Sequence, residues 1–195
     1  ELDGLLLDDE VTLVPDGISV VKACSMLGVP VAERITGVEV CTYLLEELDR
    51  QAASLFLFGA QPEVVRKLAD RLAAEFPKIR LLGYSDGYVS DKDGVFDRIC
   101  GMRPDVCLVA LGVPAQERLI YKHIDRFDKG IFIGVGGSFD VLSGAKKRAP
   151  KIFIDLNLEW LYRIACEPKR LKRFYNNNVK FILDVKKEQR KTCRS

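Results

Sequence analysis

Two kinds of hydrophobic pattern alternate along this chain. Short runs that are apolar nearly throughout, and rich in β-branched and aromatic residues, predict strands buried on both faces. These runs are residues 11–14, 54–58, 79–84, 106–111 and 131–135. Segments whose apolar residues recur every three or four positions predict helices, at residues 18–27, 38–53, 62–76, 116–127 and 152–165. The alternation predicts an α/β fold, a mostly parallel sheet sandwiched by helices as in Rossmann-like domains.

In such sheets ligands bind outside the carboxyl ends of the strands, so the residues after each predicted strand are the first candidates for a site. Four of the five connections combine glycine with polar or acidic residues, as a pocket built from loops requires. The connections are Pro15-Asp16-Gly17, Gly59-Ala60-Gln61, Ser85-Asp86-Gly87-Tyr88, Gly112-Val113-Pro114-Ala115-Gln116-Glu117 and Gly136-Gly137-Ser138-Phe139-Asp140. They bring Asp16, Gln116, Gly136, Gly137 and Asp140 forward as candidate site residues.

Charge is distributed unevenly. Residues 163–195 carry eleven Lys/Arg against three Asp/Glu, a net charge of +8, whereas residues 1–162 carry 19 against 25, a net charge of −6. An acidic body with a basic tail indicates that the tail is the part that meets an anionic partner. Because Pro168 is the natural break, we predict an α/β domain over residues 1–165 and a basic helical appendage over residues 166–195.

The tail also has an apolar side. Its apolar residues recur at helical spacing, at Leu171, Phe174, Tyr175, Val179, Ile182 and Val185. A basic amphipathic helix is typical of a segment that binds at a membrane surface. The alternative is a terminal helix whose apolar stripe packs on its own domain while its charges are solvated. The sequence leaves both open.

Composition narrows the class of protein. With 195 residues, 48% of them apolar and 30% charged, the chain is typical of a globular domain and unlike collagen, coiled coils or disordered chains. No uncharged stretch approaches the ~18–20 residues of a membrane span. The start is acidic rather than basic, unlike a signal peptide, so we expect a cytosolic protein. The six cysteines form no CxxC pair and His123 is the sole histidine, which disfavours a structural zinc.

Several familiar chemistries are disfavoured. The segment Gly134 to Phe139 resembles a dinucleotide-binding GxGxxG motif, but Phe139 replaces its third glycine and the segment follows the fifth predicted strand. Neither a GxxxxGK[ST] phosphate loop nor a GxSxG nucleophile motif occurs. Ser–His–Asp chemistry would need His123, which we expect to be a solvated histidine on a helix. Nucleic-acid binding is disfavoured because the aromatic residues of the tail lie in or beside its apolar stripe.

Two interpretations stay open for the polar candidates. Asp16 directly precedes a predicted helix, where it is either an N-cap or a carboxylate that takes a proton from a hydroxyl nucleophile. Gln116 either donates hydrogen bonds to a substrate oxygen or closes its own turn. A group of arginines is either solvated or binds phosphate as a bidentate fork. These arginines are Arg34, Arg148, Arg163, Arg170 and Arg173.

Seven short motifs occur in an order that resembles one family, the WecG/TagA/CpsF glycosyltransferases. They are Pro-Asp-Gly-Ile (15–18), Glu-Arg-Ile-Thr-Gly (33–37), Gly-Val-Pro-Ala-Gln-Glu (112–117), Gly-Val-Gly-Gly-Ser-Phe-Asp (134–140), Arg-Ala-Pro (148–150), Leu-Glu-Trp-Leu-Tyr-Arg (158–163) and Glu-Pro-Lys-Arg (167–170). Each motif alone is weak, but seven in order are specific. The resemblance covers about residues 13–183.

The resemblance implies transfer of a sugar from a UDP donor to a polyprenyl-diphosphate-linked saccharide at the cytoplasmic face of the membrane. The best-known branch adds N-acetylmannosamine to lipid-linked N-acetylglucosamine at the start of wall teichoic acid synthesis. It implies that Asp16 is the general base, that Gln116 positions substrate, that a C-terminal arginine-bearing segment closes over the site, and that no metal or other cofactor is needed. We therefore predict Asp16 as the catalytic residue. The predicted substrate-binding residues are Gln116, Arg34, Gly136, Gly137, Asp140, Arg163, Arg170 and Arg173.

One departure from the family pattern bears on activity. Members carry a longer segment before the Pro-Asp-Gly motif, including a strand that ends at the active site, whereas fifteen residues precede Asp16 here. We expect the sheet to lack that strand and the pocket to lack one wall. The alternative function is thus a non-catalytic protein that binds a UDP-sugar or a lipid diphosphate. A missing edge strand and an apolar tail also favour a homo-oligomer.

Overall fold

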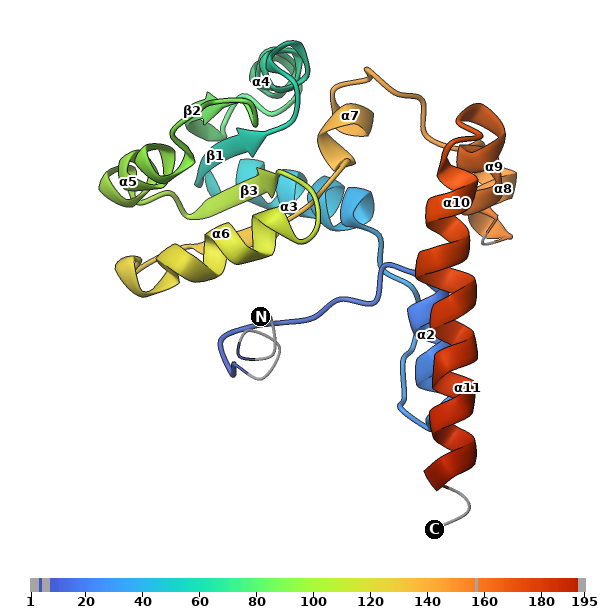
Figure 1. Cartoon of the computed structure of the whole chain (residues 1–195). Helices are drawn as coiled ribbons and strands as arrows, with labels where there is room; N and C mark the ends of the chain where they lie inside the picture. The colour runs from blue at the N-terminus through green and yellow to red at the C-terminus, as the bar shows by residue number, and fades with distance from the viewer. Residues whose placement is uncertain (1–3, 5–7, 157, 193–195) are drawn as a thin grey trace. The chain divides into compact units, whose positions relative to one another are not determined.

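We describe a computed structural model of the chain, which covers residues 4, 8–156 and 158–192 (Figure 1). Its contacts divide the chain into two compact units. The first, called the sheet unit below, comprises Glu1–Thr12 and Gly37–Lys147. The second, called the helical unit, comprises Leu13–Thr36 and Arg148–Ser195. Each unit is described by itself.

The described residues of the sheet unit form a four-stranded parallel sheet. The strands are β1 (Ser54–Gly59), β2 (Arg80–Ser85), β3 (Val106–Ala110) and β4 (Ile131–Gly134), and their order is β2-β1-β3-β4. The chain leaves β1 toward one edge of the sheet and leaves β3 toward the other. The carboxyl ends of β1 and β3 therefore form the topological switch point, where sheets of this kind bind ligands.

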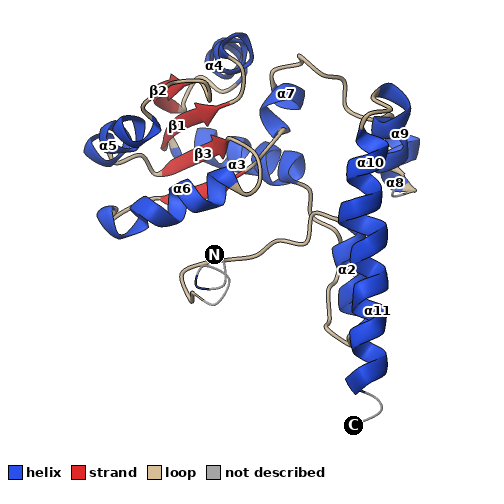
Figure 2. Ribbon diagram, viewed as in Figure 1, coloured by secondary structure: helices blue, strands red, loops and turns tan. Residues whose placement is uncertain are grey.

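Helices cover both faces of this sheet (Figure 2). One face packs against α3 (Gly37–Gln51), α4 (Pro62–Glu75) and α7 (Ser138–Leu142), and the other against α5 (Lys92–Met102) and α6 (Ala115–His123). Alternate residues of β1 serve the two cores, Leu55 and Leu57 in the first and Phe56 and Phe58 in the second. Burial on both faces explains the uninterrupted apolar runs of the sequence. The predicted α/β fold class is confirmed.

The helical unit contains α2 (Ile18–Met26), α8 (Lys151–Asp155), α9 (Glu159–Cys166), α10 (Arg170–Phe174) and α11 (Lys180–Thr192). A π-helical segment, Tyr175–Val179, joins α10 to α11, so the predicted basic tail is helical. α2 lies along this helix (Figure 1), where Ser19 Oγ donates to Asn178 Oδ1 at 2.7 Å. The rings of Trp160 and Phe174 stack with centroids 4.4 Å apart and join α9 to α10.

The predicted strand at residues 11–14 does not form. These residues have no regular secondary structure, and Leu13 and Val14 are exposed. β-branched and apolar residues favour a strand only where a neighbouring strand and a packed face receive them, and the described residues provide neither for this segment. Asp16 is therefore not at the end of a strand, as the sequence pattern predicts, but in a loop that leads into α2.

Two other elements differ from the prediction. Helix α5 is absent from the predicted set, although Asp91 caps it by accepting a hydrogen bond from Gly94 N at 2.8 Å. The predicted helix at residues 152–165 is two helices, α8 and α9. The sequence Asp155-Leu156-Asn157 at the break contains two residues that favour helix ends over helix interiors.

The predicted boundary between residues 165 and 166 lies within the helical unit, and the division into a catalytic domain and an appendage stays a prediction.

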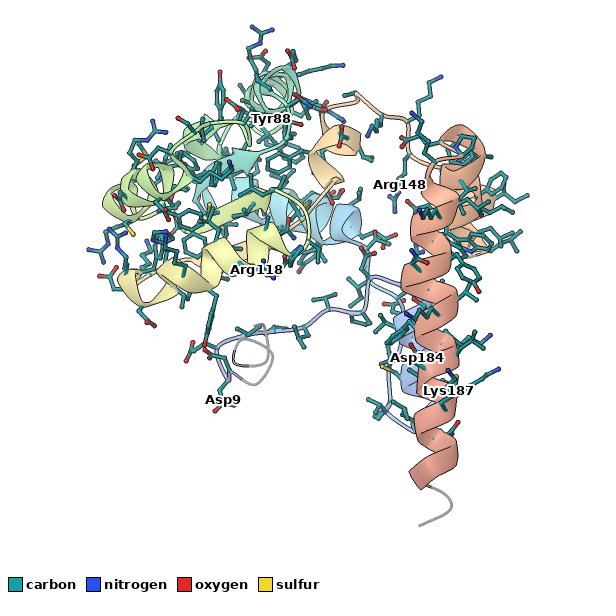
Figure 3. The ribbon with its side chains drawn as sticks, in the orientation of Figure 1. Asp9, Tyr88, Arg118, Arg148, Asp184 and Lys187 are labelled. Atoms are coloured by element: carbon teal, nitrogen blue, oxygen red, sulfur yellow. The ribbon has the colours of Figure 1, made fainter. Side chains whose placement is uncertain are left out.

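Of the two alternatives for the tail, α11 does pack on part of its own chain, since Gln189 Nε2 donates to the carbonyl of Met26 at the end of α2. Figure 3 labels Asp184 and Lys187, which form an exposed ion pair along α11. No helix among the described residues has the length and apolar character that crossing a membrane demands.

Candidate functional site

The carboxyl ends of β1 and β3 lie in direct contact at the switch point. Ala60 N, just after β1, donates to the carbonyl of Ala110, the last residue of β3, at 2.9 Å. Gly59 has φ +125°, and a Cβ there would lie 2.4 Å from the same carbonyl oxygen. This close approach requires glycine. The loops after β1 and β3 consequently begin next to each other.

Gln116 joins the loops after β3 and β4 from a buried position. Its Oε1 accepts from Gly112 N, in the loop after β3, and from Gly136 N, in the loop after β4, both at 3.1 Å. The side chain is 2% exposed, and a Cβ on Gly134 would lie 2.5 Å from its Nε2. Gln116 therefore closes its own turn and also holds Gly136 in place, whereas its contact with a substrate stays a prediction.

Asp140 lies on the short helix α7, whose N-cap is Gly137. Its Oδ1 is 3.6 Å from Lys146 Nζ, and its carbonyl accepts from Lys146 N at 2.8 Å. The hydrogen bond from Gly136 N to Gln116 links this helix to the loop after β3. The structure thus brings together four of the predicted residues, Gln116, Gly136, Gly137 and Asp140, within the sheet unit.

The other predicted residues belong to the helical unit. The N-cap of α2 is Gly17, so Asp16 stands one residue ahead of the capping position, and the role of its carboxylate stays a prediction. Ile35 N donates to the carbonyl of Pro15 at 3.2 Å, which places the Pro-Asp-Gly motif beside the segment that carries Arg34. Asp16 and Arg34, eighteen positions apart in sequence, therefore adjoin the two residues that this backbone hydrogen bond joins.

Arg34 is not a solvated surface charge. Its side chain is 12% exposed, and its Nη2 lies 3.1 Å from Glu159 Oε2, which is 8% exposed. Glu159 is at the start of α9 and belongs to the Leu-Glu-Trp motif, yet the sequence pattern did not single it out. A buried carboxylate opposite a buried arginine fixes the position of the guanidinium. Arg163 lies on α9, and Arg170 and Arg173 lie on α10; their side chains are outside the described part of the chain.

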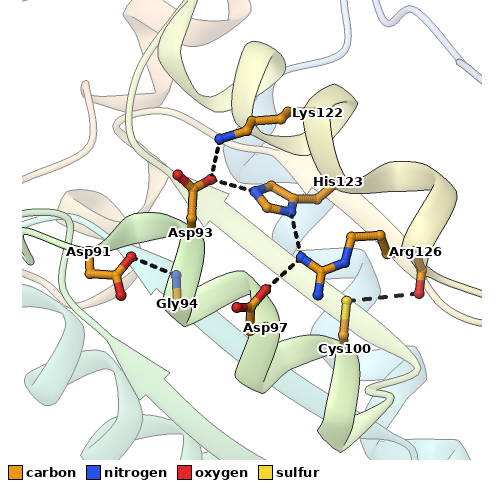
Figure 4. Close-up of polar contacts among 8 residues, drawn as sticks. All are labelled: Asp91, Asp93, Gly94, Asp97, Cys100, Lys122, His123 and Arg126. Carbon is orange, nitrogen blue, oxygen red and sulfur yellow. Dashed lines mark hydrogen bonds and ion pairs between the residues drawn. The ribbon is translucent and has the colours of Figure 1, made fainter.

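The expectation of a solvated His123 is wrong. The residue is 4% exposed, and its ring stacks on Phe96 with centroids 4.9 Å apart. Its Nε2 is 2.6 Å from Asp93 Oδ1 and its Nδ1 is 3.2 Å from Arg126 Nη1 (Figure 4). Because a guanidinium can only donate, Nδ1 accepts and the proton is on Nε2. α6 starts after the carboxyl end of β3 and His123 is its last residue, so this contact ties α6 to α5 away from the switch point.

The amino-acid sequence of this chain is similar to a known protein family and to named bacterial proteins. The model of the glycosyl transferase WecG/TagA/CpsF family matches residues 5–195. A Bacillus spizizenii protein named N-acetylglucosaminyldiphosphoundecaprenol N-acetyl-beta-D-mannosaminyltransferase is 40% identical over 182 residues, which are 93% of this chain and 70% of that protein. Proteins of the same name from Bacillus subtilis and Staphylococcus aureus are 41% and 37% identical, over 91% and 95% of this chain and 69% and 73% of their own lengths.

This chain belongs to the WecG/TagA/CpsF family. The resemblance predicted from the seven motifs is confirmed, and so is the assignment to the glycosyltransferases. The match covers both the sheet unit and the helical unit.

The structure of this glycosyltransferase reveals a second polar residue, besides Glu159, that the sequence pattern passed over. Glu117 follows Gln116 in the family motif, and its Oε1 accepts from Gln116 Nε2 at 2.8 Å. Its other oxygen, Oε2, is buried and has no hydrogen-bond partner among the described residues. The one feature of the sequence that could have indicated Glu117 is its place in the family motif, residues 112–117. The burial of a single carboxylate oxygen is visible only in the structure.

A metal site finds no support in the described part of the glycosyltransferase, where His, Cys, Asp and Glu side chains do not gather in groups of three or more. The carboxylates near the switch point have different partners: Asp140 pairs with Lys146, and Glu117 accepts a hydrogen bond from Gln116. Metal independence stays a prediction, as do the roles of the nine predicted site residues.

Proposed function

We propose that this chain transfers N-acetylmannosamine from UDP to undecaprenyl-diphosphate-linked N-acetylglucosamine, with inversion at the anomeric carbon. The observation that carries the proposal is the 37–41% identity to three proteins named as N-acetylmannosaminyltransferases acting on that acceptor. The product would serve wall teichoic acid synthesis, as the resemblance implies.

In this proposal Asp16 is the general base. The acceptor hydroxyl attacks C1 of the donor sugar and gives its proton to the Asp16 carboxylate. The new C1–O bond forms as the bond from C1 to the diphosphate breaks, and the electron pair leaves with UDP. Asp16 lies in the loop that leads into α2, one residue ahead of the N-cap Gly17. A positioned base contributes typically 10²–10⁴-fold to a rate.

Negative charge develops on the departing UDP and requires cationic or hydrogen-bonding groups already in place. We assign this role to Arg34 together with Arg163, Arg170 and Arg173. Two observations support the assignment: the ion pair that holds Arg34 against Glu159, and the stacking of Trp160 on Phe174, which joins α9 to α10. Gln116, Gly136, Gly137 and Asp140 would bind the substrate from the loops after β3 and β4.

The test is UDP release from UDP-N-acetylmannosamine, with and without a short-chain lipid-diphosphate N-acetylglucosamine acceptor. We expect acceptor-dependent release that falls by at least about 10²-fold in Asp16→Asn. Asp9→Asn, an exposed aspartate of the N-terminal segment, is the matched control and should keep full activity. UDP binding without acceptor-dependent release in the unmodified chain would instead favour the non-catalytic alternative.

We further propose that the helical unit binds the cytoplasmic face of the membrane peripherally, through the basic C-terminal segment. Leu171 and Tyr175 are 58% and 57% exposed on that segment, and its net charge of +8 would attract anionic lipid. Vesicles of phosphatidylglycerol should bind the chain and vesicles of phosphatidylcholine should not. Leu171→Glu should weaken binding, while Met102→Glu, at an exposed apolar residue of α5, should leave it unchanged. Equal binding to both vesicles would contradict this proposal.

Self-association is a separate part of the proposal. The apolar side chains exposed on the helical unit, Leu171 and Leu183 among them, would be covered in a homo-oligomer as well as on a membrane. Light scattering of the full chain in the absence of lipid measures this directly. A monomeric mass at all concentrations would contradict self-association and leave the membrane proposal standing.

A further inference from the structure

Glu117 holds a buried carboxylate oxygen without a hydrogen-bond partner. Within the described part of the chain, Oε1 accepts from Gln116 Nε2 at 2.8 Å, while Oε2 has neither a donor nor contact with solvent. Buried polar atoms in native proteins are almost always hydrogen-bonded, and leaving a charged one unpaired is costly. An exception in a native fold therefore calls for a physical explanation.

The position of this oxygen is fixed by its neighbours. Glu117 is in the first turn of α6, which begins directly after β3, one of the two strands of the switch point. Gln116 holds Oε1, and Gln116 is itself held by Gly112 N and Gly136 N. The carboxylate thus belongs to a chain of hydrogen bonds that joins the loops after β3 and β4. Such support is what holds a binding group in one geometry before its ligand arrives.

A structural role explains only part of this arrangement. A carboxylate in the first turn of a helix interacts favourably with the helix dipole. Glu63 occupies the first turn of α4 in that way, and it is exposed. The dipole does not require a buried oxygen. The burial of Oε2 adds a desolvation cost that no hydrogen bond within the described part of the chain offsets.

We propose that Glu117 Oε2 accepts a hydrogen bond from a hydroxyl group of the nucleotide-sugar donor. This inference rests on the proposed function. A carboxylate oxygen only accepts, so the ligand group must donate. The diphosphate would be repelled, whereas the ribose and the sugar both carry hydroxyl groups. A site built to bind a hydroxyl rejects an analogue that lacks it strongly, because its buried polar group is then left unpaired. Glu117 is therefore a binding and specificity residue, and Gln116 positions it.

The experiment measures binding of UDP and of UDP-N-acetylmannosamine to the full chain by calorimetry, together with KM and kcat for the donor. Two variants are compared with the unmodified chain. Glu117→Gln keeps the size and an oxygen that can accept from Gln116, and Glu117→Ala removes the group. Glu63→Gln is the control for loss of a first-turn charge. Circular dichroism and the Tm of each variant establish that it is folded.

We expect Kd and the KM for the donor to rise about tenfold or more in both Glu117 variants. The value of kcat should stay close to that of the unmodified chain, and Glu63→Gln should change neither constant. Weaker binding of both ligands would assign the hydroxyl to the ribose. Weaker binding of UDP-N-acetylmannosamine alone would assign it to the sugar.

Three results separate this inference from the function on which it rests. Folded Glu117 variants with unchanged Kd values would overturn the inference alone. An unmodified chain that binds UDP or its sugar more tightly than the variants, yet shows no acceptor-dependent release, would overturn the proposed transferase and keep the inference. An unmodified chain that binds neither ligand would overturn both.

Discussion

At the residue scale, Asp105 shows how one carboxylate can join the amino ends of two strands. Its Oδ2 accepts from Ser54 N at 2.8 Å and from Ser54 Oγ at 2.6 Å, and its Oδ1 is 2.7 Å from Lys129 Nζ. The hydrogen bond from Lys129, and then those from Ser54, hold the pKa of Asp105 well below its usual range. The start of β1 is thereby tied to the residue that precedes β3.

This lowered pKa predicts a pH dependence of stability. Because the pKa is lower in the folded chain than in the unfolded one, ~3.9, ionised Asp105 contributes stability above the unfolded value. That contribution is lost as pH falls through the lower, folded pKa. Asp105→Asn should lower the free energy of unfolding at neutral pH by about 1–3 kcal/mol and flatten its fall below pH ~4. Urea denaturation from neutral to acid pH measures both.

The control for this prediction is Asp128→Asn. Asp128 pairs with Arg103, but both side chains are more than half exposed. An exposed pair of this kind is worth about 0–1 kcal/mol. If Asp105→Asn and Asp128→Asn had equal effects at all pH values, the structural role given to Asp105 would be wrong.

Residue identity alone misplaced His123. The sequence places it near the end of a helix among polar neighbours, which favours exposure, yet the ring is buried between Asp93 and Phe96 of α5. The wrong prediction of an exposed His123 has the same cause as the omission of α5, because α5 is the helix that covers His123. A side chain's exposure depends on elements far from it in sequence, so it cannot be read from its immediate neighbours.

At the element scale, α5 depends on its N-cap. Asp91 accepts from Gly94 N at 2.8 Å, and Gly94 and Gly101 within the helix lower its intrinsic propensity. Apolar residues at helical spacing, Val95, Phe96 and Ile99, pack against β1 and β3. The cap and the packed face together outweigh the glycines.

We therefore expect Asp91→Ala to lower the free energy of unfolding by about 0.5–2 kcal/mol. Asp91→Asn, which can still accept from Gly94 N, should lower it much less. Chemical denaturation of both variants measures the difference. A loss that is equal in the two variants would show that the charge of Asp91, rather than its cap, is what stabilises α5.

Most of the predicted helices and strands agree closely with the structure. The predicted ranges match within two residues for α2, α3, α4 and the four described strands β1 to β4, because each segment has a clear hydrophobic pattern along the chain. The strand predicted at residues 11–14 failed for the opposite reason. Its residues suit a strand, but none of the four described strands pairs with it.

At the scale of the whole molecule, the sheet unit should fold without the helical unit. Residues 37–147 contain all four described strands and both hydrophobic cores. A fragment with these residues should show helical circular dichroism and a single cooperative unfolding transition. A fragment with residues 37–105 is the matched control, because it lacks β4 and also β3, one of the two inner strands. It should show no cooperative transition, and absence of one in residues 37–147 would contradict the prediction.

The sequence by itself determined the fold class and the family. The period of a strand or helix is a local property, so alternation of the two periods is enough to predict a parallel sheet sandwiched by helices. The ordered motifs were enough to predict the family, because they are short, local and read directly from the chain. Asp16, Gln116 and Arg34 emerged as candidates at that level.

Only the tertiary structure decided how those candidates are held. Arg34 and Glu159 are 125 residues apart in sequence, and no local period connects them. Which residue is the N-cap of α2, and which oxygen of Glu117 stays without a partner, depend on backbone groups and packing that the chain brings together only when it folds. Hydrogen bonding and burial are properties of neighbours in space, whereas the pattern of a sequence reports neighbours along the chain.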